Sequence, residues 1–252
     1  MTTTATVAAE LGRIASLGNL LGVNTARLLG RLTPLATYCG KDLVVTMSHG
    51  FDALSATTTV PRDTARTLCG PWLDALAGDQ LSLQLDASSI TAYSDEAALP
   101  DAAPEVVRQL GGELASLGYD GTTWTYVLEH SNSDDTLLAG TLARMDAVAD
   151  KLGVTMPQRL IATKLHRSLS RGAPTRTSVR VKGNTVAPQL AISWDRVEWQ
   201  PVGSMLGGFH PQQGAIGQLP RIARTCEVEE ATVDLILGPS DPPAMRIAMR
   251  LA

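Results

Sequence analysis

Charged side chains stand at alternate positions in several segments of the sequence that have the composition of β-strands. Side chains at alternate positions of a strand point to the same face of a sheet, so in each segment the charges share one face and apolar residues occupy the other. Guanidinium groups bind phosphate in bidentate fashion, and carboxylates accept protons. The candidate site comprises two proton carriers, four cationic side chains and two threonines on polar strand faces, namely Glu129, Asp234, Arg180, Lys182, Arg246, Arg250, Thr57 and Thr125.

Two interpretations of these polar faces are open at the level of sequence. In the first, the faces are exposed to water, as in any half-exposed antiparallel sheet. In the second, helices cover the apolar faces and the polar faces line a closed lumen, where charges must be paired or used. Arg180, Arg246 and Arg250 would then face one cavity and hold an anionic small-molecule substrate, with Glu129 and Asp234 as internal partners or proton carriers.

The order of elements favours an antiparallel sheet combined with helices. Hydrophobic periodicity predicts one helix followed by two strands, repeated about five times. Strands joined in hairpins are antiparallel, so the fold class is α+β or a closed antiparallel barrel with helices outside. No linker rich in Ser, Gly or Pro divides the chain, and we expect a single domain over residues 1–252. Helices are predicted at 5–34, 62–77, 104–117, 143–152 and 213–226, and strands at 42–48, 54–60, 81–85, 89–93, 122–130, 135–141, 178–181, 189–195, 232–237 and 245–251.

The composition argues against several other classes of protein. Hydrophobic residues make up 44% of the chain and charged residues 18%, which is enough apolar material for a packed core. The formal charge is −4 and no segment is strongly basic, so we expect no nucleic-acid partner. No run of 18 apolar residues occurs, so we expect no membrane span.

Signals for metals and cofactors are also missing from the sequence. The dinucleotide-binding, phosphate-loop and zinc-protease motifs are absent, and we expect neither a cofactor nor a metal site. The three cysteines, Cys39, Cys69 and Cys226, lie far apart. We therefore expect no disulfide framework and a cytoplasmic location.

Short segments along the chain carry a resemblance to a known family. Leu20–Val23, Val44–Gly50 and Thr57–Pro61 look like the first helix and first strand pair of the aromatic prenyltransferases of the ABBA, or prenyltransferase-barrel, family. In that family, repeated α-β-β-α units close an antiparallel ten-stranded barrel surrounded by helices, and a prenyl group is transferred from an allylic diphosphate to an aromatic acceptor. Metal-dependent members carry an acidic residue in the second strand, whereas Leu54–Thr57 offers none. The resemblance therefore implies prenyl transfer without a metal site.

Three functions remain open from the sequence. The first is prenyl transfer to an aromatic acceptor in small-molecule biosynthesis. The second is a barrel of the same fold that has lost diphosphate chemistry and acts as a cyclase or isomerase on a biosynthetic intermediate. An aromatic content of 4%, a thin lining for an allylic cation, favours this second function. The third is a non-catalytic ligand- or peptide-binding barrel, supported by the scarcity of obvious catalytic residues.

Overall fold

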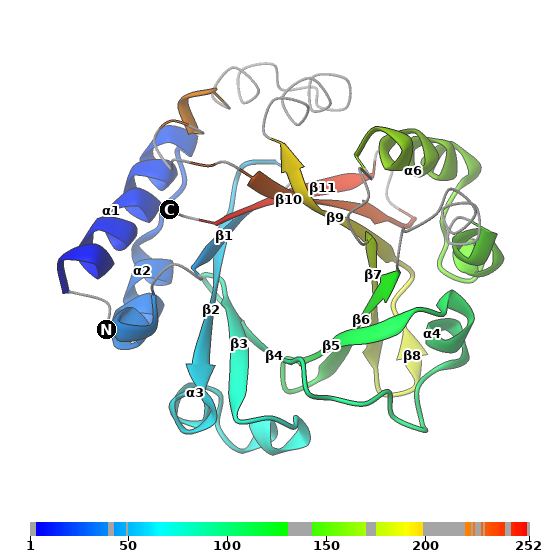
Figure 1. Cartoon of the computed structure of the whole chain (residues 1–252), viewed down its shortest axis with the longest axis horizontal. Helices are drawn as coiled ribbons and strands as arrows, with labels where there is room; N and C mark the ends of the chain where they lie inside the picture. The colour runs from blue at the N-terminus through cyan, green and yellow to red at the C-terminus, as the bar shows by residue number, and fades with distance from the viewer. Residues whose placement is uncertain are drawn as a thin grey trace.

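Ten antiparallel strands close into a barrel within the part of the chain that the computed structural model describes, which is residues 4–39, 43–48, 50–130, 143–169, 175–198, 220–222, 224, 228, 230–239 and 243–250 (Figure 1). The strands are β1 (Val44–Met47), β2 (Leu54–Pro61), β3 (Gln80–Leu85), β4 (Ile90–Ser94), β5 (Glu113–Tyr119), β6 (Thr123–His130), β7 (Thr175–Lys182), β9 (Leu190–Glu198), β10 (Glu230–Leu237) and β11 (Ala244–Arg250). Consecutive strands pair from β1 to β7, β7 pairs with β9, and the sheet continues through β10 to β11, which pairs with β1. A two-residue strand, β8 (Thr185–Val186), pairs with the end of β7. The antiparallel α+β barrel expected from the sequence is confirmed.

The helices lie outside the ring of strands (Figure 1). They are α1 (Thr4–Leu21), α2 (Ala26–Leu32), η1 (Thr33–Tyr38), α3 (Arg62–Cys69), η2 (Pro71–Ala75), α4 (Glu105–Leu110) and α6 (Met156–Leu169), and residues 143–149 are also helical. Two polar contacts show how they meet the wall of the barrel. Thr58 of β2 donates its hydroxyl to the carbonyl of Tyr38 in η1 at 2.9 Å, and the indole of Trp194 in β9 donates to Nδ1 of His166 in α6 at 2.9 Å.

The hydrophobic core is the layer between the strands and these helices. Along β2, the outward side chains of Leu54, Ala56, Thr58 and Val60 are 0–5% exposed, whereas the residues that alternate with them are more accessible. This period-two alternation recurs along most of the strands and gives the sheet one apolar and one polar face. Burial of the apolar face beneath the helices holds the barrel together.

The barrel has two distinct ends, which we name by their connections. At the hairpin end, turns join β1 to β2, β3 to β4 and β5 to β6. At the opposite end, the crossover end, β2 runs directly into α3 and β4 leads to α4. The antiparallel register places Thr123 and Lys182 at the hairpin end, and Glu129 and Arg176 at the crossover end.

The predicted helix at 104–117 is wrong in its second half. The helix α4 ends at Leu110, because Gly111 and Gly112 adopt positive φ angles of 62° and 88°. A Cβ on Gly112 would stand 2.7 Å from the backbone oxygen of Glu129, so the chain passes β6 there and continues as β5. The strand predicted at 135–141 lies outside the described residues.

The boundaries of other helices also differ from the predicted ones. Gly22 (φ 68°) separates α1 from α2 in the predicted helix at 5–34, and Gly70 (φ 76°) separates α3 from η2 in the predicted helix at 62–77. The helix predicted at 213–226 lies mostly outside the described residues.

Candidate functional site

The polar faces of the strands line the inside of the barrel. On β7, Val179 and Val181 are buried in the core layer, and the side chain of Arg180 between them is 48% exposed. Since the apolar faces meet the helices outside, the alternating polar side chains point into the lumen. The inward side chains of Arg176 and Arg246 are 41% and 37% exposed, so solvent enters the space around them. The lumen interpretation of the sequence is the one that the structure has.

A cluster of ion pairs occupies the crossover end of the lumen. Arg176 of β7 lies between two carboxylates: its Nε donates to Glu129 Oε2 at 3.0 Å, and its Nη1 lies 3.0 Å from Asp195 Oδ2. The second oxygen of Asp195 accepts a hydrogen bond from the hydroxyl of Thr232 at 2.9 Å. These contacts join β6, β7, β9 and β10 across the inner surface of the wall. Glu129, a candidate proton carrier, is thus held by a guanidinium.

A β-bulge accompanies Asp195 in this cluster. The pairing of β9 with β10 shifts between Ala231 and Val233, so that Asp195 and Arg196 together face one residue of β10. Arg196 takes a positive φ of 54°, an uncommon conformation for a residue with a side chain. Bulges commonly re-aim a side chain, and here the carboxylate of Asp195 meets Arg176.

The other candidate carboxylate, Asp234, lies in register between Ser193 of β9 and Arg246 of β11. Its Oδ2 is 3.3 Å from Nη2 of Arg246. Burial raises the pKa of the Asp234 carboxyl, although the Arg246 guanidinium and a hydrogen bond from Ser193 act in the opposite direction. A carboxylate with a raised pKa is a better proton acceptor than an exposed one.

Tyr93 of β4 places a phenol among these charges. Its ring lies on the inner surface of Gly118, where a Cβ would stand 2.5 Å from Cε1 and 2.7 Å from Cδ1 of the ring. Its hydroxyl donates to Oε1 of Gln84 at 3.2 Å, and the amide of Gln84 donates to Ser55 Oγ at 3.4 Å. A hydrogen bond with Thr125 also acts on the phenol. The ring and the hydroxyl are therefore both held in place.

The environment of Tyr93 also shows which cations converge. Burial raises the pKa of the Tyr93 phenol, and the charges of Arg246 and Arg180 act to lower it. Around the barrel, β4 is separated from β7 by β5 and β6, and from β11 by β3, β2 and β1. The charges of two arginines from well-separated strands thus both act on one phenol inside the barrel.

Arg180 has a carboxylate partner as well. Its Nη2 lies 3.3 Å from Oδ2 of Asp120, in the turn between β5 and β6 at the hairpin end. Burial acts to raise the pKa of Asp120, but hydrogen bonds from Thr122 and Thr123 and the charge of Arg180 outweigh it and hold the pKa below its usual value.

The remaining candidate residues lie on the inner face but not in one cluster. Lys182 is exposed at the hairpin end opposite Thr123, and Arg250 is exposed at the crossover end opposite Val44. Thr57 is half-buried on β2, between β1 and β3. The expectation that Arg180, Arg246 and Arg250 face one cavity agrees with their place on the inner face of one barrel, with Arg250 at the crossover end. Among the predicted cations, Arg180 and Arg246 are the two whose charges act on the Tyr93 phenol.

Sequence reasoning missed three residues of the lumen. Arg176 continues the alternation of Ser178 and Arg180, but the strand was predicted to begin at 178, whereas β7 begins at Thr175. Asp195 and Tyr93 each stood at the end of a predicted strand. Extending the period-two pattern by one step was the signal that could have found Arg176.

Metal ligands do not gather in the part of the chain that the structure describes. Within it, no three His, Cys, Asp or Glu side chains lie where they could hold a metal ion together. Among the same residues, no helix is long and apolar enough to span a membrane.

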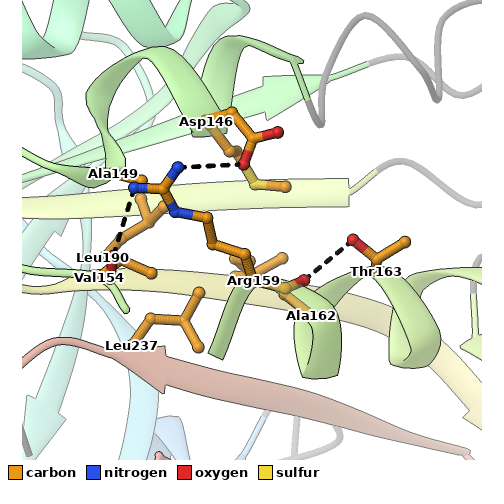
Figure 2. Close-up of a pocket in the computed structure, with 10 residues that line it drawn as sticks. Asp146, Ala149, Val154, Arg159, Ala162, Thr163, Leu190 and Leu237 are labelled. Atoms are coloured by element: carbon orange, nitrogen blue, oxygen red, sulfur yellow. Dashed lines mark hydrogen bonds and ion pairs between the residues drawn. The ribbon is translucent and has the colours of Figure 1, made fainter. Parts of the chain in front are cut away.

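A pocket outside the barrel lies between α6 and the strands β9 and β10 (Figure 2). It is lined mainly by apolar side chains, with Arg159 across it. Figure 2 shows Arg159 directed toward Asp146, 3.9 Å away, and toward the carbonyl of Val154; it also pairs with Asp150. With its guanidinium engaged in these contacts, the pocket offers less chemistry than the lumen.

Comparison with solved structures identifies the architecture. The chain is similar to 5-dimethylallyl tryptophan synthase from Streptomyces coelicolor in complex with DMASPP and Trp, with a TM-score of 0.65 over 96% of this chain and 94% of that chain. The fold is that of a prenyltransferase barrel. A second structure of 5-dimethylallyltryptophan synthase from Streptomyces coelicolor gives a TM-score of 0.62, covering 96% of each chain.

The sequence identity to these two structures is low, at 11% and 12%, so the comparison establishes the fold alone. The sequence matches no protein-family model and no curated relative. The activity must therefore be argued from the lumen of this barrel.

Proposed function

We propose that this barrel binds an allylic diphosphate in its lumen and transfers the prenyl group to an aromatic small molecule. One observation carries the proposal: Arg180 and Arg246, partly exposed on the inner face of well-separated strands, each pair with a carboxylate at 3.3 Å, and the charge of each acts on the Tyr93 phenol. The two guanidiniums offer donors to an anion with several oxygens, and the Tyr93 hydroxyl, which donates to Gln84 in the structure, turns to the same anion when it binds. The similarity to a solved complex with DMASPP and Trp supports the same substrate class.

The chemistry follows from where charge develops. When the bond between the allylic carbon and the diphosphate oxygen breaks, the bonding electrons leave with the diphosphate, and Arg180, Arg246 and Tyr93 stabilise the negative charge. Donors fixed in advance at such a position give the largest single contribution in many enzymes. Lys182, at the hairpin end, adds a further positive charge for the anion.

The proton of the acceptor goes to a carboxylate. After the ring carbon of the acceptor attacks the allylic cation, the ring loses a proton and recovers its aromaticity. Asp234, whose pKa is raised by burial, accepts that proton beside Arg246. Glu129 is less suited to this role, because its carboxylate already pairs with Arg176 at 3.0 Å.

A second function is favoured by the aromatic content of the lumen. Of the tyrosines and tryptophans that the structure describes, Tyr93 reaches the charged groups inside the barrel, while Trp124 and Trp72 pack against Tyr119. An allylic cation has little aromatic shielding in such a lumen. Asp234 and Tyr93 would then serve as a proton-transfer pair for cyclisation or isomerisation of a polar intermediate that carries no diphosphate.

Calorimetric titration with dimethylallyl diphosphate, with and without magnesium, separates the two functions. We expect the wild type to bind the diphosphate in both buffers and Arg180→Gln to lose at least about tenfold in affinity, as expected for a charged hydrogen bond to an anion. Arg66→Gln is the matched control, because Arg66 pairs with Asp74 outside the barrel. Absence of heat for the wild type at millimolar diphosphate would contradict prenyl transfer and leave the proton-transfer function.

A further inference from the structure

The turn between β5 and β6 fixes the position of one carboxylate. Oδ1 of Asp120 accepts three hydrogen bonds, from the backbone N–H groups of Thr122 and Thr123 at 2.9 and 2.8 Å and from the hydroxyl of Thr122 at 2.9 Å. These bonds close an Asx-type turn. The other oxygen, Oδ2, is left for Arg180. Asp120 thus stays in place whether or not Arg180 contacts it.

The contact between Asp120 and Arg180 is looser than the two ion pairs of Arg176 on the same strand. Among the described residues, the guanidinium of Arg180 has one hydrogen-bond partner, Asp120 at 3.3 Å, and the side chain is 48% exposed. Arg176, in contrast, is held by two carboxylates at 3.0 Å. Half-exposed ion pairs with one long contact are weak, so Arg180 can exchange this partner for another anion.

We propose that Asp120 is a built-in competitor for the anion that binds at Arg180, and that it makes the lumen selective for polyanions such as diphosphate. The inference rests on the proposed function of the same site. A ligand with a single negative charge gains little at Arg180 that Asp120 does not already supply. A diphosphate bears several charges and also reaches Arg246 and Tyr93, so it displaces Asp120 from the guanidinium.

The substitution Asp120→Asn isolates this effect from the fold. The Asn Oδ1 atom still accepts the hydrogen bonds that close the turn. Its amide NH2 group is a donor, as is the guanidinium of Arg180, so the two do not form a hydrogen bond. The variant therefore keeps the turn and loses the competing charge. Asp86→Asn is the matched control, since Asp86 closes the turn between β3 and β4 at the same end by accepting from Ser88 and Ser89.

Calorimetric titration with inorganic pyrophosphate, and in parallel with acetate, tests the proposal on full-length wild type and both variants. We expect Asp120→Asn to bind pyrophosphate about three- to tenfold more tightly than wild type, because one like charge near the anion is removed. We also expect measurable acetate binding in Asp120→Asn and none in wild type. Asp86→Asn should stay within about twofold of wild type, because Asp86 bonds to Ser88 and Ser89 of its own turn and its carboxylate does not pair with Arg180.

The outcomes separate this inference from the function on which it rests. If wild type binds pyrophosphate and Asp120→Asn binds it no more tightly than Asp86→Asn does, the competitor role is overturned and the proposed function stands. If no variant binds pyrophosphate although each unfolds at the temperature of wild type, both are overturned. Adding Arg180→Gln to Asp120→Asn should remove the gain, which ties it to this guanidinium.

Discussion

Each end of the lumen has an arginine of strand β7, and the two arginines have different partners. At the crossover end, Arg176 lies between Glu129 and Asp195, with both carboxylates at 3.0 Å. Toward the hairpin end, Arg180 on the same strand meets a single carboxylate of Asp120 at 3.3 Å. The two arginines lie only four positions apart on one face of β7, so the difference comes from their partners and not from the strand.

This difference assigns separate roles to the two ends. An arginine with two carboxylates ties neighbouring strands together and has little left for a ligand. An arginine with one weak partner keeps donors for an anion. The presence of basic residues inside a barrel therefore does not by itself predict anion binding, because carboxylates can already pair with them.

The pH dependence of stability should reveal the crossover end most strongly, because two buried histidines lie there behind Glu129 and Trp194. Burial lowers the pKa of His130 to about 4 and that of His166 to about 4. An unfolded chain binds these protons near pH 6.5, so it gains protons before the folded state does. Stability is complete above pH 6.5, falls as the pH drops, and stops falling from this source near pH 4. We expect a loss of about 1.4 kcal/mol per pH unit for each imidazole, measured by urea unfolding between pH 7 and pH 5.

The control for this pH dependence is His130→Asn, which should be less stable at pH 7 but show a flatter slope. A wild-type free energy of unfolding that stays constant from pH 7 to pH 5 would contradict the burial of neutral imidazoles at His130 and His166.

Gly118→Ala should give the next largest effect, in the middle of the lumen. The new methyl group collides with the Tyr93 ring, and we expect a loss of about 1–3 kcal/mol in urea unfolding, typical of overpacking. The pair Gly118→Ala and Tyr93→Ala should show strong coupling, since removal of the ring makes room for the methyl group. Additive effects in that double-mutant cycle would mean that the ring does not rest on Gly118.

The smallest effects compare the two arginines directly. Arg176→Met leaves Glu129 and Asp195 facing each other without a cation, and we expect it to lower the free energy of unfolding by about 1–2 kcal/mol, less than for a fully buried pair. Arg180→Met should change it by less than about 0.5 kcal/mol, as for other half-exposed pairs. Equal losses for the two variants, measured in the same urea titration, would erase the proposed distinction between the ends.

The sequence predicted which face of a strand each charged side chain occupies better than it predicted the partner with which that side chain pairs. Period two placed Arg180 and Arg246 on the inner face, and the structure agrees. It could not supply the partner of Arg180, because Asp120 sits in a turn whose contact with β7 depends on closure of the barrel. The segment Glu113–Tyr119 has residues that also suit a helix, and pairing with β4 and β6 overrode that local preference. With that strand misassigned, Gly118 was not expected beneath Tyr93.

The pairing of β11 with β1 has a consequence for how the chain is made. Residues 44–47 emerge from the ribosome long before residues 244–250, yet each strand completes the other's hydrogen bonds. Until then β1 presents an open edge, and contacts this distant in sequence form slowly. Arg246 lies on β11, so its ion pair with Asp234 forms only after most of the barrel wall has been synthesised, and a chaperone that shields the edge of β1 would raise the yield of closed barrels.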